Sequence, residues 1–196
     1  IEFSLTAHAL KTKNVSLDVR LNGAHYKNEM TKMPLDEITG RPKDFYQTSY
    51  YGWQKGHSIY DFYLRHYEGV NPDNGNAQWT QYVATYEDGT TEYVTDMELF
   101  KSQHRGQKYS ISKETTEDWT TATKYYIGES AIPTLTGGFG FDLRVYDFTL
   151  STTFAYALGG KAFDYTYQNL MADGVVGSNN WHKDIENRWQ KPGDVT

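Results

Sequence analysis

The stretch GGFGFDLRVYDFTLSTTFAYAL, residues 137–158, decides the fold that we expect for this chain. Large apolar side chains stand at every second position over 139–145, turn chemistry follows at Tyr146-Asp147, and the alternation resumes over 148–158. Successive side chains of a strand point to opposite faces of its sheet, so the pattern predicts an antiparallel hairpin with one apolar face.

The second face of this hairpin is made of small residues. A strand of a soluble sandwich usually carries long Lys and Glu side chains where it meets water, but residues 148–158 contain neither. Small residues suit a crowded, enclosed lumen, and they also suit a sheet face covered by a loop. Those on the return strand are Thr149, Ser151, Thr153, Ala155 and Ala157.

A second hairpin is predicted at the start of the chain. Apolar and polar residues alternate over 1–9 and again over 15–22, with a polar break at 11–14. The expected apolar row of the first run is Ile1, Phe3, Leu5, Ala7 and Ala9. If both hairpins cross a membrane, Ile1, Phe3, Leu5, Phe139, Phe141 and Leu143 face lipid, whereas Glu2, Thr6, Asp18, Arg20, Asp142 and Arg144 face the lumen.

The composition of the 196 residues excludes several classes of function. Lys and Arg number 19 against 25 Asp and Glu, so the chain lacks the basic excess that a nucleic-acid partner requires. The absence of cysteine excludes disulfides, Cys-ligated metals and a thiol nucleophile. No apolar run is long enough for a transmembrane helix. The strands of a membrane barrel do not require such a run, because only every second residue is apolar. Because the chain begins within an alternating pattern and ends in turn chemistry, we expect an internal piece of a longer protein.

The middle and the end of the chain follow other patterns. Within the polar, aromatic segment 31–130, we predict a strand over 58–64, a turn over 71–76, a hairpin at Asp88-Gly89 and a short helix or turn over 96–100. Apolar residues at helical spacing predict helical turns over 163–170 and 181–189. The expected N-cap of the second is Asn180, and the expected stop is Pro192-Gly193.

No constellation for covalent chemistry emerges from the sequence. Ser130 lacks the second Gly of a nucleophile elbow, and no two of the six His residues stand at metal-binding spacing on a helix. We interpret Glu114, Glu117 and Asp118 as a solvated face. We therefore predict no catalytic residue, no metal ligand and no cofactor, and expect that the protein is not an enzyme.

Aromatic residues in loop-like surroundings are the remaining candidates for a site. Their faces stack on sugar rings or pack against a protein partner, and they also pack long loops against each other. The candidate residues for binding substrate or partner are Tyr50, Tyr51, Trp53, Trp79, Trp119 and Trp181, with Tyr46 beside them.

Several ordered pieces of the sequence resemble a known family, the SusC-like TonB-dependent transporters of Bacteroidetes outer membranes. Singly each piece is weak, but their order and spacing together are specific, and they extend over about residues 56–192. The pieces are GHSIYDFY at 56–63, YEGVNPDNGNAQW at 67–79, ATKYYIG at 122–128, PTLTGGFG at 133–140, YALGGK at 156–161 and WHKD at 181–184 with Arg188-Trp189. Asn71 and Asn74 depart from the family pattern, and this affects a turn.

The resemblance implies an all-β fold, a segment from the C-terminal half of a large antiparallel transmembrane β-barrel with long extracellular loops and short helical turns. It implies an outer-membrane location, contact with outer-membrane lipid, and import of an oligosaccharide or oligopeptide with energy transmitted by TonB. It also implies a SusD-like lipoprotein partner and a dimer of transporter–lipoprotein pairs. The family's plug domain and its TonB-binding segment are not in the 196 residues.

On this basis we divide the chain into a barrel hairpin at 1–30, barrel strands and an extracellular loop region at 31–130, a barrel hairpin at 131–160 and an extracellular loop with short helices at 161–196. Two alternatives stay open. One is a soluble secreted β-sandwich that binds carbohydrate, in which the apolar rows form an internal core. The other is a β-rich hydrolase whose remaining catalytic residues lie outside the chain.

Overall fold

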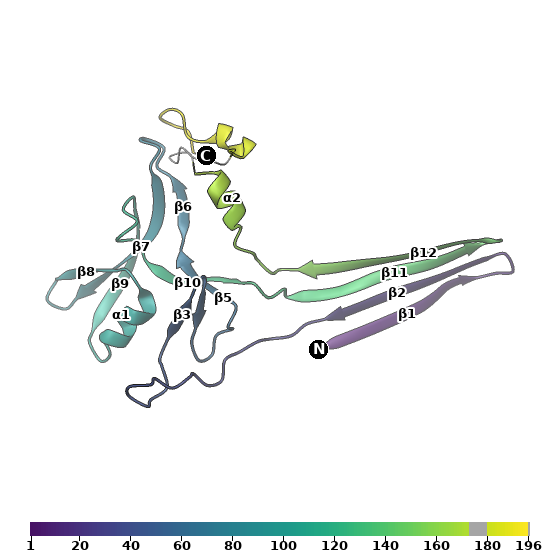
Figure 1. The fold of residues 1–196 in the computed structure, drawn as a ribbon, viewed down its shortest axis with the longest axis horizontal. Helices are drawn as coiled ribbons and strands as arrows, with labels where there is room; N and C mark the ends of the chain where they lie inside the picture. The colour runs from purple at the N-terminus through teal and green to yellow at the C-terminus, as the bar shows by residue number, and fades with distance from the viewer. Residues whose placement is uncertain (173–179, 196) are drawn as a thin grey trace. The chain divides into compact units, whose positions relative to one another are not determined.

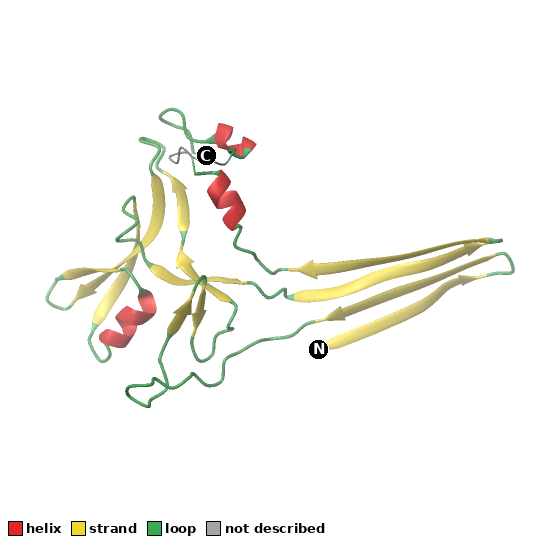
Figure 2. Ribbon diagram, viewed as in Figure 1, coloured by secondary structure: helices red, strands yellow, loops and turns green. Residues whose placement is uncertain are grey.

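The computed structural model describes residues 1–172 and 180–195, and its fold is all-β with antiparallel sheets, as predicted. Figure 2 shows strands and loops with a few short helices. Among the described residues, no helix has the length and apolar character needed to cross a membrane. Contacts group the chain into two compact units, which we call unit 1 (residues 1–29 and 129–161) and unit 2 (residues 30–128 and 162–196).

Unit 1 is a four-stranded sheet built from the two predicted hairpins (Figure 1). Its strands lie in the order β1 (Glu2–Lys11), β2 (Val15–Ala24), β11 (Leu135–Val145) and β12 (Phe148–Leu158). The predicted turn at Tyr146 is confirmed: this residue has a φ of 55°, and its N–H donates to Asn14 O at 2.7 Å.

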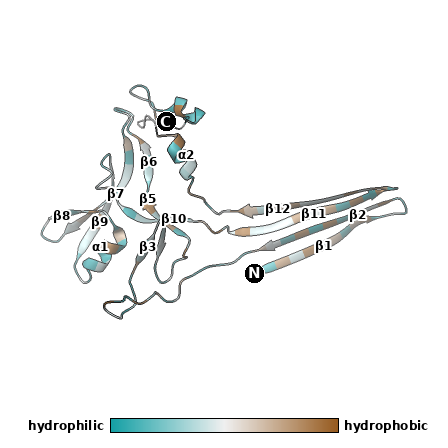
Figure 3. Cartoon of the chain, viewed as in Figure 1, coloured by the Kyte–Doolittle hydropathy of each residue, from teal (hydrophilic) through white to brown (hydrophobic). Residues whose placement is uncertain are grey.

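The strand register gathers the apolar residues of unit 1 on one face. Opposed residues of antiparallel strands share a face, and the pairing aligns apolar side chains across all four strands. One such row is Leu5, Leu21, Phe139 and Phe154, in which the two Phe rings stack at 4.8 Å. Figure 3 shows the resulting alternation of hydrophobic and hydrophilic residues along the strands.

One residue of the predicted apolar row was assigned wrongly. The pairing of β1 with β2 shifts between His8 and Leu10, so Leu10, and not Ala9, pairs with Leu17. A β-bulge places one extra residue in a strand and reverses the alternation beyond it. The bulge therefore keeps a large apolar residue in the row of Leu17, Leu143 and Leu150.

Glycines allow a close approach near one end of this sheet. Gly23 and Gly137 are opposed on β2 and β11, and a Cβ at Gly137 would meet the backbone carbonyl of Asn22 and the hydroxyl of Tyr156. The Tyr156 hydroxyl donates to Asn22 O at 2.8 Å. Phe3 lies against Gly23 in the same way. The aromatic rings of Phe3 and Tyr156 thus cover the two glycines, which have no side chain of their own.

Unit 2 contains two further antiparallel sheets. One has the order β10 (Lys124–Ser130), β5 (Asp61–Arg65), β4 (Tyr51–Trp53) and β3 (Tyr46–Thr48). In the other, β7 (Ala77–Tyr86) pairs with β6 (Tyr67–Val70) and β8 (Thr91–Val94) and also with β9 (Tyr109–Thr116). The predicted hairpin at Asp88-Gly89 is confirmed as the turn between β7 and β8.

One buried hydrophobic cluster of unit 2 lies where α1 (Met97–Gln103) packs on the sheet of β7. Its buried residues are Ala84, Val94, Met97 and Phe100. Asp96 begins the helix, because its carboxylate accepts a hydrogen bond from Leu99 N at 3.0 Å. The predicted short helix over 96–100 is therefore confirmed, and it continues to Gln103.

Two predicted boundaries in unit 2 were wrong. The strand expected over 58–64 begins only at Asp61, because the Asp61 carboxylate accepts from Ser58 N at 3.1 Å and closes a turn before it. The second C-terminal helix is a 3-10 helix, η1 (Lys183–Asn187), which follows α2 (Tyr165–Leu170). Its N-cap is His182, whose ring accepts from Asp184 N at 3.2 Å, and not Asn180.

The assignment of residues 1–30, 31–130, 131–160 and 161–196 to barrel and extracellular parts stays a prediction. Residues 173–179 and 196 of the last segment lie outside the described residues.

Candidate functional site

The polar face of unit 1 carries a cross-strand network of charged residues. Arg20 on β2 contacts both carboxylate oxygens of Asp142 on β11, and Ser151 on β12 donates to the same carboxylate. On β1, His8 Nδ1 lies 2.6 Å from the Asp18 carboxylate. Two-pronged Arg–carboxylate contacts fix the side chains as well as pairing their charges. This face is thus polar and ordered by its own side chains.

The apolar face of unit 1 is exposed. Phe139 is 47 % exposed, Leu150 53 % and Phe148 83 %, and β1 is exposed along its whole length. Scattered apolar side chains on a surface are ordinary, but continuous rows over four strands mark a site where a membrane or another protein covers the sheet. The predicted alternation is therefore confirmed, with its apolar side open.

The first three aromatic candidates lie in β4 or in the turn that joins β3 to β4, and each ring packs against another side chain of unit 2. Tyr50 stacks on Phe163 with 4.1 Å between ring centroids, and Tyr51 packs on Phe62 at 5.1 Å. Trp53 packs on Tyr46 at 5.7 Å, and its Nε1 donates to Ile59 O at 3.1 Å. These contacts hold strands and loops of unit 2 together.

Trp79 and Trp119 form a separate pair. Their rings meet edge to face at 5.3 Å, and the Arg65 guanidinium lies 4.6 Å from the Trp119 ring centroid. Arg65 is itself fixed by a hydrogen bond from its Nε to Ala122 O at 3.0 Å. Trp119 remains 50 % exposed, so it offers aromatic surface on a rigid support.

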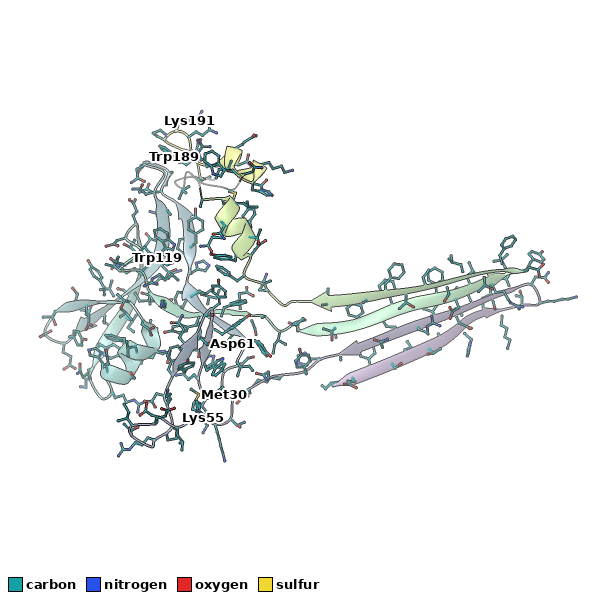
Figure 4. All side chains as sticks on the ribbon, in the orientation of Figure 1. Met30, Lys55, Asp61, Trp119, Trp189 and Lys191 are labelled. Carbon is teal, nitrogen blue, oxygen red and sulfur yellow. The ribbon has the colours of Figure 1, made fainter. Side chains whose placement is uncertain are left out.

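The last candidate, Trp181, belongs to the C-terminal segment of unit 2. It is 52 % exposed, and it makes no aromatic contact with another described residue. Figure 4 shows Trp119 well separated from Trp189 in the C-terminal segment of unit 2. The six predicted residues therefore do not converge on one site.

The sequence did not predict a cavity of about 660 Å³ between the β6–β7 hairpin and the C-terminal helices of unit 2. Aromatic and charged side chains line it together, and the Tyr167 hydroxyl donates to the Asp184 carboxylate at 3.3 Å. Burial and the neighbouring Asp184 raise the pKa of Tyr167. The helical spacing of apolar residues in the C-terminal segment predicted its helices, but it gave no indication that these helices contact β6. The lining includes Tyr67, Val70, Tyr167, Asp184, Arg188 and Trp189.

The C-terminal segment also holds the turn between β6 and β7. Trp189 Nε1 donates to Pro72 O at 3.0 Å, and the Trp189 ring lies against Gly75, whose φ is 78°. A side chain at Gly75 would collide with that ring. The predicted turn over 71–76 is thus confirmed, with a role in seating Trp189.

The interpretation of Glu117 as part of a solvated face was incomplete. Its carboxylate accepts hydrogen bonds from the side-chain amides of Asn71, Asn74 and Asn76, at distances from 2.5 to 3.2 Å. These donors lower the pKa of Glu117. Although it is open to solvent, Glu117 fixes the β6–β7 turn against the end of β9.

The described part of the chain holds no group of three or more His, Cys, Asp or Glu side chains arranged to bind a metal. The arrangement instead offers surfaces: an apolar sheet face, a polar sheet face and aromatic groups in unit 2.

Comparison with known proteins gives a match of fold. No protein-family model and no curated protein sequence matches the chain. The structure of the RagAB peptide transporter contains a chain that matches all of ours with a TM-score of 0.72 and 21 % identity. The RagAB peptide importer in its closed-closed state matches 98 % of our chain with a TM-score of 0.69 and 20 % identity. Our chain spans 19 % of the length of each. It therefore has the fold of one portion of these transporter chains.

Proposed function

We propose that the chain is a segment of a SusC-like, TonB-dependent transporter in an outer membrane, and that the whole protein imports a large nutrient. The carrying observation is the four-stranded sheet of unit 1, with one exposed apolar face and one ion-paired polar face. Its strands have 10 or 11 residues. That length matches the 9–11 or so residues that a tilted strand needs to cross a bilayer.

The two faces support this assignment together. In hydrocarbon, apolar residues such as Phe139 and Leu150 no longer meet water, so their exposure carries no penalty. The opposite face holds Arg20 and Asp142, whose charges suit a wet lumen. A membrane strand must alternate in this way, because lipid and lumen lie on its two sides.

The edges of the sheet indicate what surrounds it. β1 and β12 each have one backbone edge without a partner strand among residues 1–172 and 180–195. Unpaired backbone N–H and C=O groups are very costly in hydrocarbon, so only closed barrels cross as sheets. We assign the missing partners to further strands of the same barrel, outside the 196 residues.

Cargo and partners are part of the proposal. The matching solved structures are described as a peptide transporter and a peptide importer, so an oligopeptide is the first cargo to test and an oligosaccharide the second. The partners we propose are a SusD-like surface lipoprotein, TonB acting through the plug region, and a second copy of the transporter–lipoprotein pair. Import requires no covalent step, and we propose no catalytic residue.

The soluble β-sandwich that binds carbohydrate is the alternative function. It requires the apolar rows of unit 1 to form an internal core. Phe148, Leu150 and Phe154 are instead 83 %, 53 % and 48 % exposed. A second soluble sheet would have to cover them.

The direct test is to locate the full-length protein and measure its uptake activity. Envelopes of the producing cell are separated on a density gradient, and the protein is expected in the outer-membrane fraction and to need detergent for extraction. Deletion of its gene is expected to abolish depletion of a labelled oligopeptide mixture from the medium, while uptake of a single amino acid continues. Extraction without detergent would disprove the membrane assignment. Unchanged depletion of both oligopeptides and oligosaccharides would disprove the transport assignment.

A further inference from the structure

A loop between β2 and β3 is held in one conformation by its own hydrogen bonds (Figure 1). Backbone bonds join Asp36 N to Arg41 O at 2.8 Å and Lys43 N to Pro34 O at 2.9 Å. The Asp36 carboxylate accepts from Ile38 N, Thr39 N and Thr39 Oγ1 at 2.9–3.1 Å. A loop ordered in this way loses little conformational freedom when a partner binds.

This loop faces α1 across a groove of about 600 Å³, which we call the loop groove. Arg105, just beyond α1, reaches across to Asp44 with 2.8 Å between Nη2 and Oδ1. Apolar side chains line part of the groove, and among them Leu99 is 51 % and Tyr46 44 % exposed. The apolar lining consists of Pro42, Phe45, Tyr46 and Leu99.

The carboxylates that line the loop groove already have partners. Asp36 is occupied within its own loop, and Asp44 is paired with Arg105. Glu98 accepts from Gln54 Nε2 and Lys101 Nζ, both at 2.7 Å. Asp44 and Glu98 are thus each matched by a cation, whereas Asp36 is held by uncharged donors and is the one groove carboxylate whose charge is not matched by an ion pair in the described part of the chain.

Two cations of the groove stand against that single carboxylate and leave an excess of positive charge. Arg41 and Lys43 form no ion pair within the described residues, and the Lys43 ammonium lies 5.3 Å from the Tyr46 ring centroid. They stand out in a chain whose net charge is −6. Their positive charge beside an apolar lining is complementary to a ligand that is both acidic and apolar.

We infer that the loop groove docks an extended, acidic segment of a partner protein, with an aliphatic or aromatic side chain on Leu99 and Phe45 and a carboxylate at Arg41 and Lys43. A free inorganic anion would bind Arg41 and Lys43 but would leave the apolar lining exposed to water. A lipid surface is disfavoured, because Glu37 stands beside Ile38 at the loop tip and would approach anionic headgroups. This inference does not depend on what the whole protein transports.

The test uses the purified full-length protein and two fluorescein-labelled octapeptides. One alternates Leu with Asp, and the other alternates Leu with Lys. Fluorescence anisotropy is expected to show at least tenfold tighter binding of the Asp peptide. The double variant Arg41→Glu/Lys43→Glu is expected to reverse this preference. Leu99→Ser is expected to weaken binding severalfold without reversing it.

A matched variant carries the same charge change elsewhere. Lys32→Glu/Lys55→Glu replaces two exposed lysines that do not line the groove, and it is expected to keep the preference for the Asp peptide. The inference is overturned if neither peptide binds, if both bind equally, or if the two double variants behave alike.

Discussion

The two units of the chain treat apolar residues in opposite ways. Unit 2 encloses Ala84, Val94 and Phe100 between a helix and a sheet, at 0 %, 1 % and 3 % exposure. Unit 1 displays Phe139 and Leu150 on the outside of a single sheet layer. A sheet without a second layer is stable only where something else covers its apolar face. The same residue types thus form a water-excluding core in one unit and an outer surface in the other.

The largest effect is expected in the core of unit 2. Phe100→Ala removes a ring packed on Tyr109 and His104, with centroids 5.0 and 4.2 Å away, and leaves a cavity. Loss of a buried Phe side chain costs about 3–5 kcal/mol. Hydrogen exchange of the β7 amides in the full-length protein measures this loss. Leu99→Ala on the exposed side of α1 is the control, and similar exchange in both variants would contradict the enclosed core.

Leu143→Arg is expected to produce the next largest effect, in unit 1. Leu143 lies in the apolar row with Leu17 and Leu150. An Arg on the lipid face near the bilayer midplane costs about 2–4 kcal/mol. Folding of the full-length protein into lipid vesicles, followed by gel mobility without heating, measures this cost. Ser151→Thr on the opposite face should be mild, and equal tolerance of the two changes would refute the two-faced sheet.

A smaller effect is expected where β2 and β11 approach closely. Gly137→Ala places a methyl group against the Asn22 carbonyl and the Tyr156 hydroxyl, so the strands must separate locally. Such overpacking costs about 1–3 kcal/mol. The measurement is the urea midpoint of the full-length protein in vesicles. Tyr156→Phe removes only the hydroxyl and its bond to Asn22 O, and it should shift the midpoint less. An unshifted midpoint in Gly137→Ala would show that the approach is loose.

The smallest effect concerns a charge in unit 2. Lys113 Nζ, at 2.7 Å, and the Thr80 hydroxyl contact the Glu68 carboxylate and lower its pKa to about 2. The pKa of Glu68 is lower in the folded protein than in the unfolded chain. The stabilisation that its charge gives the folded state is therefore complete above about pH 4.5 and disappears as the pH falls toward 2. The site is partly exposed, so we expect Glu68→Gln to cost about 1 kcal/mol near neutral pH.

The measurement for Glu68 is hydrogen exchange of the β6 and β7 amides from pH 2 to 7. The difference between Glu68→Gln and the native protein should vanish at the acidic end. Glu114→Gln on β9 removes a carboxylate that is not the ion-pair partner of Lys113, and it serves as the control. A difference that stays constant over this range would show that the carboxylate charge does not contribute.

The hairpins of unit 1 were predictable because their signal is local. Alternation over 139–145 and 148–158 fixes both the faces and the position of the turn at Tyr146. The bulge beside Ala9 was not predictable, since Leu10 satisfies the apolar row only after a shift that the partner strand imposes. The local alternation of residues therefore predicted the strands, whereas the bulge depends on how β1 pairs with β2.

The environment of the aromatic residues in unit 2 depended on residues that are distant in the sequence. Tyr50 meets Phe163, and Trp189 meets the turn at Pro72, although no periodicity connects these parts of the sequence. From the sequence, Glu117 was interpreted as a solvated acid, but in the structure three Asn side chains of the β6–β7 turn donate hydrogen bonds to it. Sequence could identify which residues are able to stack or bind, but only tertiary contacts decide which are already occupied.

The pairing of Arg20 with Asp142 leaves little uncompensated charge at this point of the polar face of unit 1. Each charge is already matched by its neighbour, and Ser151 takes up a further lone pair of the carboxylate. A migrating solute of either sign therefore finds no strong electrostatic trap at this point. If this face lines a transport path, as we propose, the paired residues do not discriminate between solutes by charge.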